Sequence, residues 1–161
     1  EKEFLQAFCY RIEFTPGART LVRAMRREGA LAALVSGGFR IYSEFVRREC
    51  GFDIDVANDV VVDGGVLTGQ LVHPVLGAQG KLEAMDAFLA DRGLSRQDAL
   101  AVGDGANDIP MLQAAGAGVA FRAKPAAAAA AQHRIEHGDL TALLYLQGYR
   151  HDEIAAAASG H

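Results

Sequence analysis

Two short apolar runs without polar alternation stand out in the chain, at residues 30–35 and at residues 99–102. A run of this kind is typical of a strand that is covered on both faces, as in a parallel sheet. The first run ends at Ser36-Gly37-Gly38 and the second at Gly103-Asp104-Gly105. We therefore predict two buried parallel strands, each followed by a loop at its carboxyl end.

Segments with apolar positions at helical spacing, bounded by glycine or proline, alternate with these runs. They predict helices over residues 1–10, 18–28, 40–49, 81–92 and 107–115, then an alanine-rich helix from Pro125 and two further short helices. A short apolar piece lies at residues 118–121. Strands that alternate with helices indicate an α/β fold with a doubly wound, mainly parallel, Rossmann-like sheet.

One segment has a different pattern. Valine-rich runs at residues 60–62 and 66–72 flank Asp63-Gly64-Gly65. Asp-Gly between β-branched runs is a strong signal for a β-hairpin, because glycine accepts the positive φ angles of the tight turn. We predict a small hairpin inserted into the α/β fold.

The composition of the chain gives no sign of a nucleic-acid-binding or membrane-spanning protein. The 161 residues are 50% apolar and carry a net charge of −4, which fits one domain with a substantial core and gives no basic surface for nucleic acid. No apolar run approaches the ~20 residues that span a membrane, and no signal peptide opens the sequence. Cys9 and Cys50 form no pairing motif, so we expect two thiols in the reducing cytoplasm.

The strongest candidate motif is the ten-residue string at 102–111, which contains Asp104, Asn107 and Asp108. It places carboxylates at the tip of a buried strand, with glycines that let the backbone approach a ligand. Asp104 is a candidate ligand for Mg²⁺, which prefers oxygen donors and often shares them with a substrate phosphate. The alternative is a capped turn without a metal, since Asn107 or Asp108 can cap the following helix.

Two weaker candidates concern an anion. Ser36 and Gly37 offer a hydroxyl and backbone N–H groups at a strand end, which suits a phosphate, although a simple turn would have the same pattern. Lys81 stands near the start of a helix, where a lysine is most often a solvated surface charge.

Taken together, Ser36-Gly37-Gly38-Phe39, Lys81 and residues 103–111 resemble the second, third and fourth motifs of the haloacid dehalogenase (HAD) phosphatases. More narrowly, they resemble the phosphoserine phosphatase family. Further matches in order and spacing are Ala57-Asn58-Asp59, Asp63-Gly64, Leu67-Thr68-Gly69, Ala115-Gly116-Ala117-Gly118 and Ala123-Lys124-Pro125. The resemblance extends from about residue 16 to residue 149.

This resemblance implies an enzyme that hydrolyses L-phosphoserine to L-serine and phosphate (EC 3.1.3.3) through an aspartyl-phosphate, the last step of serine biosynthesis. Its implied cofactor is Mg²⁺. In the implied site, Asp104 is the metal ligand. The phosphate is bound by Ser36, the Gly37 N–H, Lys81 and Asn107. Lys81 and Asp108 take part in catalysis, and Asp108 orients Lys81 or a metal-bound water. Another small phosphomonoester, such as homoserine phosphate, a sugar phosphate or a nucleotide, is an alternative substrate.

The sequence departs from the family at its first motif, Asp-x-Asp-x-Thr, whose first aspartate attacks phosphorus. Asp53-Ile54-Asp55 is the one Asp-x-Asp in the chain, but it follows the second motif and Val56-Ala57 continues it where threonine is needed. The helical cap that selects serine is also expected upstream. We therefore expect residues 1–161 to be the C-terminal two-thirds of a HAD-like core, truncated at its N-terminus and inactive alone.

The expected partners follow from this assignment. They are a small phosphomonoester and either an N-terminal fragment or a second copy of the chain, with no nucleic acid and no membrane. In the fold that the chain resembles, the first-motif strand separates the strand that ends at Ser36 from the strand that ends at Gly103, so we expect another segment to occupy that position. A non-catalytic remnant that binds anions or a partner is the alternative of another class.

Two further patterns have simpler explanations. His133 and His137 have the i,i+4 spacing of zinc-binding helices, but a strand at residues 134–136 would separate them. Arg40, Arg47 and Arg48 lie on one predicted helix, where a solvated face is expected rather than a phosphate site.

Overall fold

The computed structural model describes residue 9 and residues 11–159. The chain divides into two compact units, Glu1–Pro74 with Gly138–His161, and Val75–His137. Cys9 is helical, and the rest of the helix expected over residues 1–10 lies outside the described residues. Within the described part of the chain, no helix is long and apolar enough to cross a membrane.

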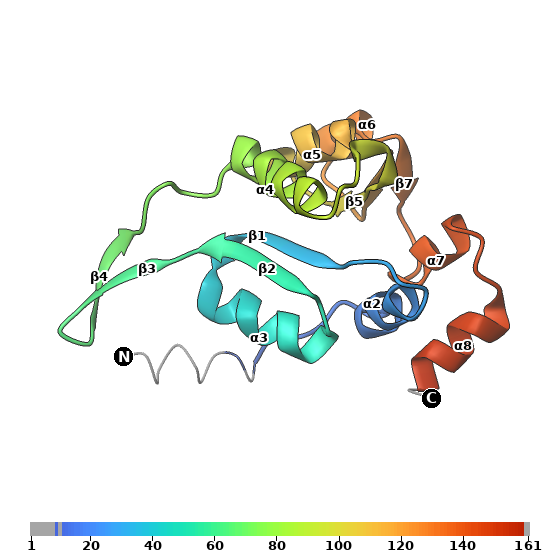
Figure 1. Cartoon of the computed structure of the whole chain (residues 1–161), viewed down its shortest axis with the longest axis horizontal. Coiled ribbons are helices and arrows are strands. Elements are labelled where there is room, and N and C mark those ends of the chain that lie inside the picture. Colours follow the sequence, from blue (N-terminus) through green and yellow to red (C-terminus); the bar gives the residue numbers. More distant parts are fainter. Residues whose placement is uncertain (1–8, 10, 160–161) are drawn as a thin grey trace. The chain divides into compact units, whose positions relative to one another are not determined.

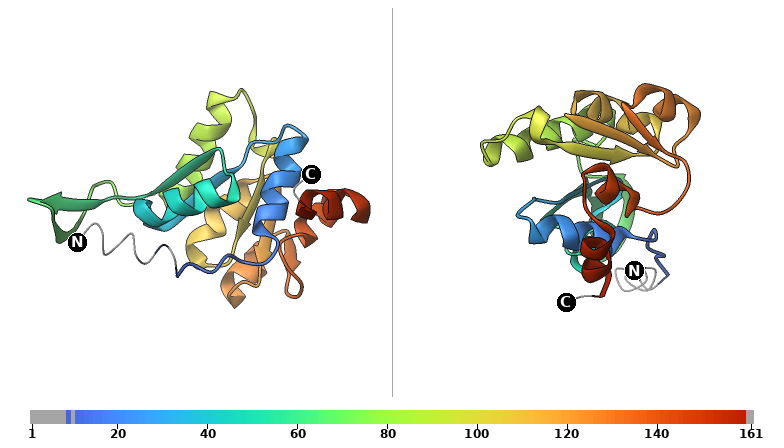
Figure 2. Two further views of the ribbon diagram at one scale, coloured as in Figure 1. Left: turned by 90° about the horizontal axis from the view of Figure 1, so that it is seen from below. Right: turned by 90° about the vertical axis from the view of Figure 1, so that its right-hand side faces the viewer.

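The first unit contains most of the strands and the C-terminal helices (Figure 1). Its elements are α2 (Ala18–Arg27), β1 (Ala33–Phe39), α3 (Arg40–Cys50), β2 (Ile54–Asn58), β3 (Val60–Asp63), β4 (Val66–Leu71), α7 (Ala142–Leu146) and α8 (His151–Ser159). β1 and β2 pair in parallel, and α3 lies along this pair. Ala24, Leu144, Ile154 and Ala157 form an apolar core between α2 and the C-terminal helices, and Figure 2 shows α8 beside α2.

The strand β1 differs from its prediction in two ways. It begins at Ala33 rather than residue 30, because Ala32 bonds to Asp53 through both its N–H and its C=O. It then continues through Ser36 to Phe39. The prediction of burial on both faces is wrong, since its residues are half-buried or exposed. Among the described strands, β1 has a ladder partner on one edge only, which is β2.

The predicted hairpin is confirmed. β3 and β4 are antiparallel, and Asp63 pairs with Val66 across a two-residue turn. Gly64 and Gly65 have φ angles of 53° and 82°, the left-handed region that this turn requires. Figure 2 shows the hairpin extending away from α3.

The second unit is a three-stranded parallel sheet with helices packed against it. Its elements are α4 (Ala78–Asp91), a 3₁₀ turn (Arg96–Asp98), β5 (Leu100–Gly103), a 3₁₀ turn (Ala106–Asp108), α5 (Ile109–Ala114), β6 (Ala117–Phe121), α6 (Pro125–Ala130) and β7 (His133–Ile135). The strand order is β5-β6-β7, all parallel. Its core contains Ala101, Met111, Leu112 and Ala115.

This unit confirms the α/β class, with shifted boundaries. α4 begins at Ala78, three residues before the predicted start at Lys81, so Lys81 lies inside the helix. The helix expected from Asn107 begins as a 3₁₀ turn and becomes α-helical at Ile109, with Pro110 in its first turn. Both changes bear on the site, because they set the directions of Lys81 and Asp108.

Candidate functional site

The loop after β5 is closed by the side chain of Asp108. Its Oδ2 accepts hydrogen bonds from the backbone N–H groups of Asp104 at 3.1 Å and Gly105 at 3.0 Å. In return, the Asp108 N–H donates to the Gly105 carbonyl at 3.0 Å. The carboxylate thus fixes the backbone that carries Asp104, whose own side chain is exposed.

Two glycines make this closure sterically feasible. A Cβ at Gly103 would overlap the side chain of Asp108, including its Oδ2 at 2.8 Å. A Cβ at Gly105 would lie 2.6 Å from Asn107 Oδ1. Neither glycine has a positive φ, so close packing against Asp108 and Asn107 is the reason for glycine at both positions.

Lys81 is the second charged residue of this site. It lies in the first turns of α4 and is only 6% exposed, so the interpretation as a solvated surface charge is wrong. Its Nζ lies 2.6 Å from Asp108 Oδ1. A buried lysine of this kind requires a charged partner, and Asp108 supplies one.

The environment of Asp108 keeps it ionised. Burial raises the pKa of its carboxyl, but the opposing effects are larger in sum: the hydrogen bond and the charge of Lys81 and the N–H groups of Gly105 and Asp104. The resulting pKa is below the usual range for aspartate. Each oxygen of the Asp108 carboxylate is engaged inside the protein. Of the two aspartates in this loop, Asp104 is therefore better placed than Asp108 to bind a ligand from outside.

The donor chemistry fits Mg²⁺ in kind, since Asp104 offers an exposed carboxylate and the ion commonly combines one or two carboxylates with water and phosphate oxygens. In the described part of the chain, no group of three or more histidine, cysteine, aspartate or glutamate side chains is arranged to hold a metal. Because Mg²⁺ takes a near-octahedral set of oxygen ligands, Asp104 would be one of several.

Ser36 and Gly37 lie in the first unit, at the carboxyl end of β1. The Gly38 N–H donates to Ser36 Oγ at 3.1 Å, and the side-chain amide of Asn58 donates to the Gly37 carbonyl at 2.9 Å. The structure thus groups Ser36 with Gly37 in one unit, and Lys81, Asp104, Asn107 and Asp108 in the other. Sequence reasoning gave Asn58 no role in the site, and the one signal for it was the match of Ala57-Asn58-Asp59 to the family that the chain resembles.

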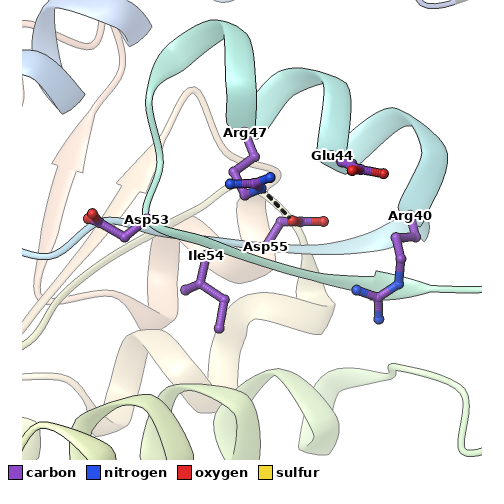
Figure 3. Close-up of a pocket in the computed structure, with 6 residues that line it drawn as sticks. All are labelled: Arg40, Glu44, Arg47, Asp53, Ile54 and Asp55. Carbon is purple, nitrogen blue, oxygen red and sulfur yellow. Dashed lines mark ion pairs between the residues drawn. The ribbon is translucent and has the colours of Figure 1, made fainter.

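The Asp-x-Asp pair at residues 53 and 55 is structural, as the sequence interpretation expected. Asp55 lies 2.9 Å from the Arg47 side chain and accepts a hydrogen bond from Ser43 at 2.6 Å. Asp53 pairs with Arg26 at 2.9 Å. Figure 3 shows Arg47 and Asp55 pointing toward each other beside an open pocket of about 280 Å³.

The arginines and histidines singled out above also have structural explanations. Arg40 pairs with Asp59 at 2.8 Å, and the Arg48 guanidinium lies 5.8 Å from the centre of the Phe45 ring. His133 is in β7 and His137 follows its end, so the two do not share a helix and the zinc-helix spacing does not apply.

A match to a protein-family model now decides the family. The model of the haloacid dehalogenase-like hydrolases covers residues 1–113, and these include the loop after β5. The chain belongs to the haloacid dehalogenase-like hydrolases. The predicted HAD-like α/β fold and the resemblance to this family are therefore confirmed.

The individual relatives of this chain are named for one activity within that family. The chain is 43% identical over 149 residues to the phosphoserine phosphatase SerB2 of Mycobacterium tuberculosis, which covers 92% of this chain and 36% of that protein. It is 39% identical over 146 residues to the phosphoserine phosphatase of Streptomyces coelicolor, covering 91% and 36%. A solved phosphoserine phosphatase, described as a phospho-aspartyl intermediate analogue, superimposes with a TM-score of 0.84 at 36% identity, covering 90% and 69%. The chain thus spans about a third of the length of these curated relatives.

Proposed function

We propose that the whole protein is a phosphoserine phosphatase that uses Mg²⁺ to hydrolyse L-phosphoserine to L-serine and phosphate. The observation that carries this proposal is the buried ion pair of Lys81 and Asp108 under the loop that presents Asp104. The names of the curated relatives support the substrate. The assignment of residues 1–161 to one HAD-like core and the cytoplasmic location belong to the same proposal.

Lys81 would bind and neutralise the phosphate. An ammonium group has three donors, and Asp108 accepts one of them at 2.6 Å, so donors remain for phosphate oxygens. Because Asp108 is itself held by two backbone N–H groups, it would keep the Lys81 Nζ in one place throughout the reaction. A fixed positive charge of this kind stabilises the charge that spreads over the transferring phosphoryl group.

The remaining residues would complete the phosphate site. Asp104 would hold Mg²⁺, which supplies charge neutralisation at the phosphate when bound. Asn107 is exposed in the same loop and would bind a phosphate oxygen or a water on it. Ser36 and the Gly37 N–H would donate to the phosphate from the end of β1.

The nucleophile of the proposed reaction is an aspartate of the family's first motif, which attacks phosphorus and forms an aspartyl-phosphate. No Asp-x-Asp-x-Thr occurs in residues 1–161. We therefore expect the isolated 161-residue chain to hydrolyse no phosphoserine, since loss of a covalent nucleophile costs on the order of 10⁶ in rate. Magnesium-dependent turnover by this purified chain would contradict that expectation. An N-terminal fragment or a second copy of the chain would be the macromolecular partner.

The test is a substrate panel with the whole protein and Mg²⁺. Phosphate release should be fastest from L-phosphoserine, with much lower kcat/KM for homoserine phosphate, glucose 6-phosphate and a nucleoside monophosphate. A preference for one of the latter would keep the phosphatase chemistry and reject the substrate. No release from any substrate, with a folded protein, would reject the enzymatic function in favour of an anion-binding remnant.

A further inference from the structure

The carboxyl end of β1 contains a bulge in its pairing with β2. Val35 pairs with Val56 and Phe39 pairs with Asn58, so β1 advances four residues while β2 advances two. Ser36, Gly37 and Gly38 therefore stand opposite a single residue of β2. A bulge of this kind removes backbone groups from the ladder, and these groups then need other hydrogen-bond partners.

The side chains of Asn58 and Ser36 supply those partners. Asn58 is 5% exposed, and its Nδ2 donates to the Gly37 carbonyl at 2.9 Å. The Gly38 N–H donates to Ser36 Oγ at 3.1 Å. The Gly37 carbonyl and the Gly38 N–H belong to the same peptide group, so the two side chains hold its opposite ends.

This arrangement has a consequence for the Ser36 hydroxyl. Because Ser36 Oγ accepts from Gly38, its own hydrogen points elsewhere and can be donated to another acceptor. Rotation of the peptide between Gly37 and Gly38 would break both bonds at once. Asn58 is buried beneath the loop, whereas Gly37 and Gly38 are exposed, so the amide that holds the peptide lies inside and the backbone that it holds faces solvent.

We propose that Asn58 is a positioning residue for phosphate binding, which acts by holding the Gly37–Gly38 peptide so that Ser36 and the Gly37 N–H keep their directions. This inference rests on the proposed function, because that function assigns phosphate to Ser36 and Gly37. In this role Asn58 would act through the peptide group and not through a contact with the phosphate. Its removal should loosen the loop, which lowers the affinity for phosphate.

The test uses the whole protein with inorganic phosphate as a competitive inhibitor. Asn58→Ala removes the amide, and Asn58→Leu removes it while keeping a similar side-chain volume. For both we expect the inhibition constant of phosphate to rise about tenfold, as is typical when one well-formed hydrogen bond is lost. Gln147→Ala is the matched control, because its side-chain amide also donates to a backbone carbonyl at 2.9 Å, in α7. The control should leave the inhibition constant unchanged.

A double variant distinguishes positioning from a general effect on the fold. If Asn58 acts through the Ser36 loop, Asn58→Leu should change phosphate inhibition less than twofold when Ser36→Ala is already present. Three outcomes would each overturn the proposal. In the first, the double variant raises the inhibition constant by the full product of the two single effects. In the others, the folded Asn58 variants leave the inhibition constant unchanged, or circular dichroism shows that both have lost the fold. Should the wild type hydrolyse no phosphoserine, the proposed function fails. Calorimetry then tests the role of Asn58 separately, by comparing the phosphate affinity of the wild type with that of Asn58→Leu. Equal affinity of the two proteins, or no phosphate binding by the wild type, overturns the positioning role of Asn58.

Discussion

Lys81 Nζ lies 2.6 Å from Asp108 Oδ1, in an ion pair whose side chains are only 8% and 6% exposed. The other oxygen of the same carboxylate closes the loop that carries Asp104. Asp108 therefore couples the position of the lysine to the position of the exposed carboxylate. A change at either partner should affect stability and activity together, which separates this pair from the surface ion pairs of the same unit.

Lys81→Ala in the whole protein should show this double effect. It leaves the Asp108 carboxylate buried without its counter-ion, which costs about 3–5 kcal/mol in the free energy of unfolding. It also leaves a phosphate charge unpaired, so kcat/KM for phosphoserine should fall to less than about a tenth of wild type. Urea unfolding and steady-state kinetics measure the two effects.

Arg96→Ala is the control for this variant. Arg96 pairs with Asp86 at 2.6 Å in the same unit, but both side chains are more than a third exposed. An exposed pair contributes about 0–1 kcal/mol. A loss of stability as large as that of Lys81→Ala, or a fall in kcat/KM, would contradict the contrast between the buried and the exposed pair.

The pH dependence of stability should reflect Asp108. Its folded pKa is below the unfolded value of about 3.9, so its contribution is present above that value and is lost as the pH falls through the folded pKa. The difference in unfolding free energy between wild type and Asp108→Asn should therefore be largest near neutral pH and shrink below about pH 4. The pKa values of Asp86 and Asp98 are also lowered, by hydrogen bonds from Arg96 and Ser95. Because both residues are present in both proteins, their contributions cancel in the difference of unfolding free energies. A difference that stays constant down to pH 2 would contradict the prediction.

Local signals in the sequence predicted part of this structure well. Asp63-Gly64-Gly65 predicted the hairpin, and Gly51 ends α3 in the left-handed conformation, as a C-cap glycine does. These features depend on a few neighbouring residues. The motif string at 102–111 was recognisable for the same reason.

Features that depend on distant contacts could not be predicted in this way. The strand β2 was not predicted, and its Asp55 is neutralised by Arg47 of α3, a contact that the local sequence does not indicate. The burial of Lys81 depends on Asp108, which is 27 positions away. Asn58 finds its partner Gly37 across the β1–β2 bulge.

Gly103→Ala should destabilise the protein, although alanine is acceptable in a strand. Its Cβ would overlap Asp108, and the shift needed to relieve this should weaken the bonds to the loop and to Lys81. We expect a loss of about 1–3 kcal/mol in unfolding free energy, as for other overpacked sites. Gly77→Ala is the control, because a Cβ there meets nothing within 4 Å and φ is −97°. Thermal unfolding that shows equal losses for both variants would contradict the packing role of Gly103.

Asp55→Asn tests the structural assignment of the Asp-x-Asp pair. The substitution removes the charge that faces Arg47 and weakens the bond from Ser43, so unfolding free energy should fall by about 1–3 kcal/mol. The magnesium concentration that gives half-maximal activity should stay the same, because both carboxylate oxygens of Asp55 are already engaged, one by Arg47 and the other by Ser43. A shift in that concentration of tenfold or more would show that Asp55 takes part in metal binding.

Asp104→Asn should have the opposite profile, with activity lost and stability retained. The side chain of Asp104 is exposed, and its position in the loop is fixed through backbone groups: its N–H donates to Asp108, and its carbonyl accepts from Lys124 at 2.9 Å. Asparagine keeps this backbone and the side-chain shape, so the unfolding free energy should change by less than about 0.5 kcal/mol.

The neutral amide is a poorer ligand for Mg²⁺, which prefers charged oxygen donors. In the whole protein, kcat/KM for phosphoserine should therefore fall more than tenfold, and higher Mg²⁺ should restore part of it. Calorimetry on the isolated 161-residue chain should show only weak Mg²⁺ binding, because in the proposed function Asp104 would be one ligand of a site that requires several. Micromolar binding to this chain would show that other residues within it complete the site. A variant that keeps more than about a tenth of wild-type kcat/KM, a loss below ~1.4 kcal/mol, would remove Asp104 from the metal site.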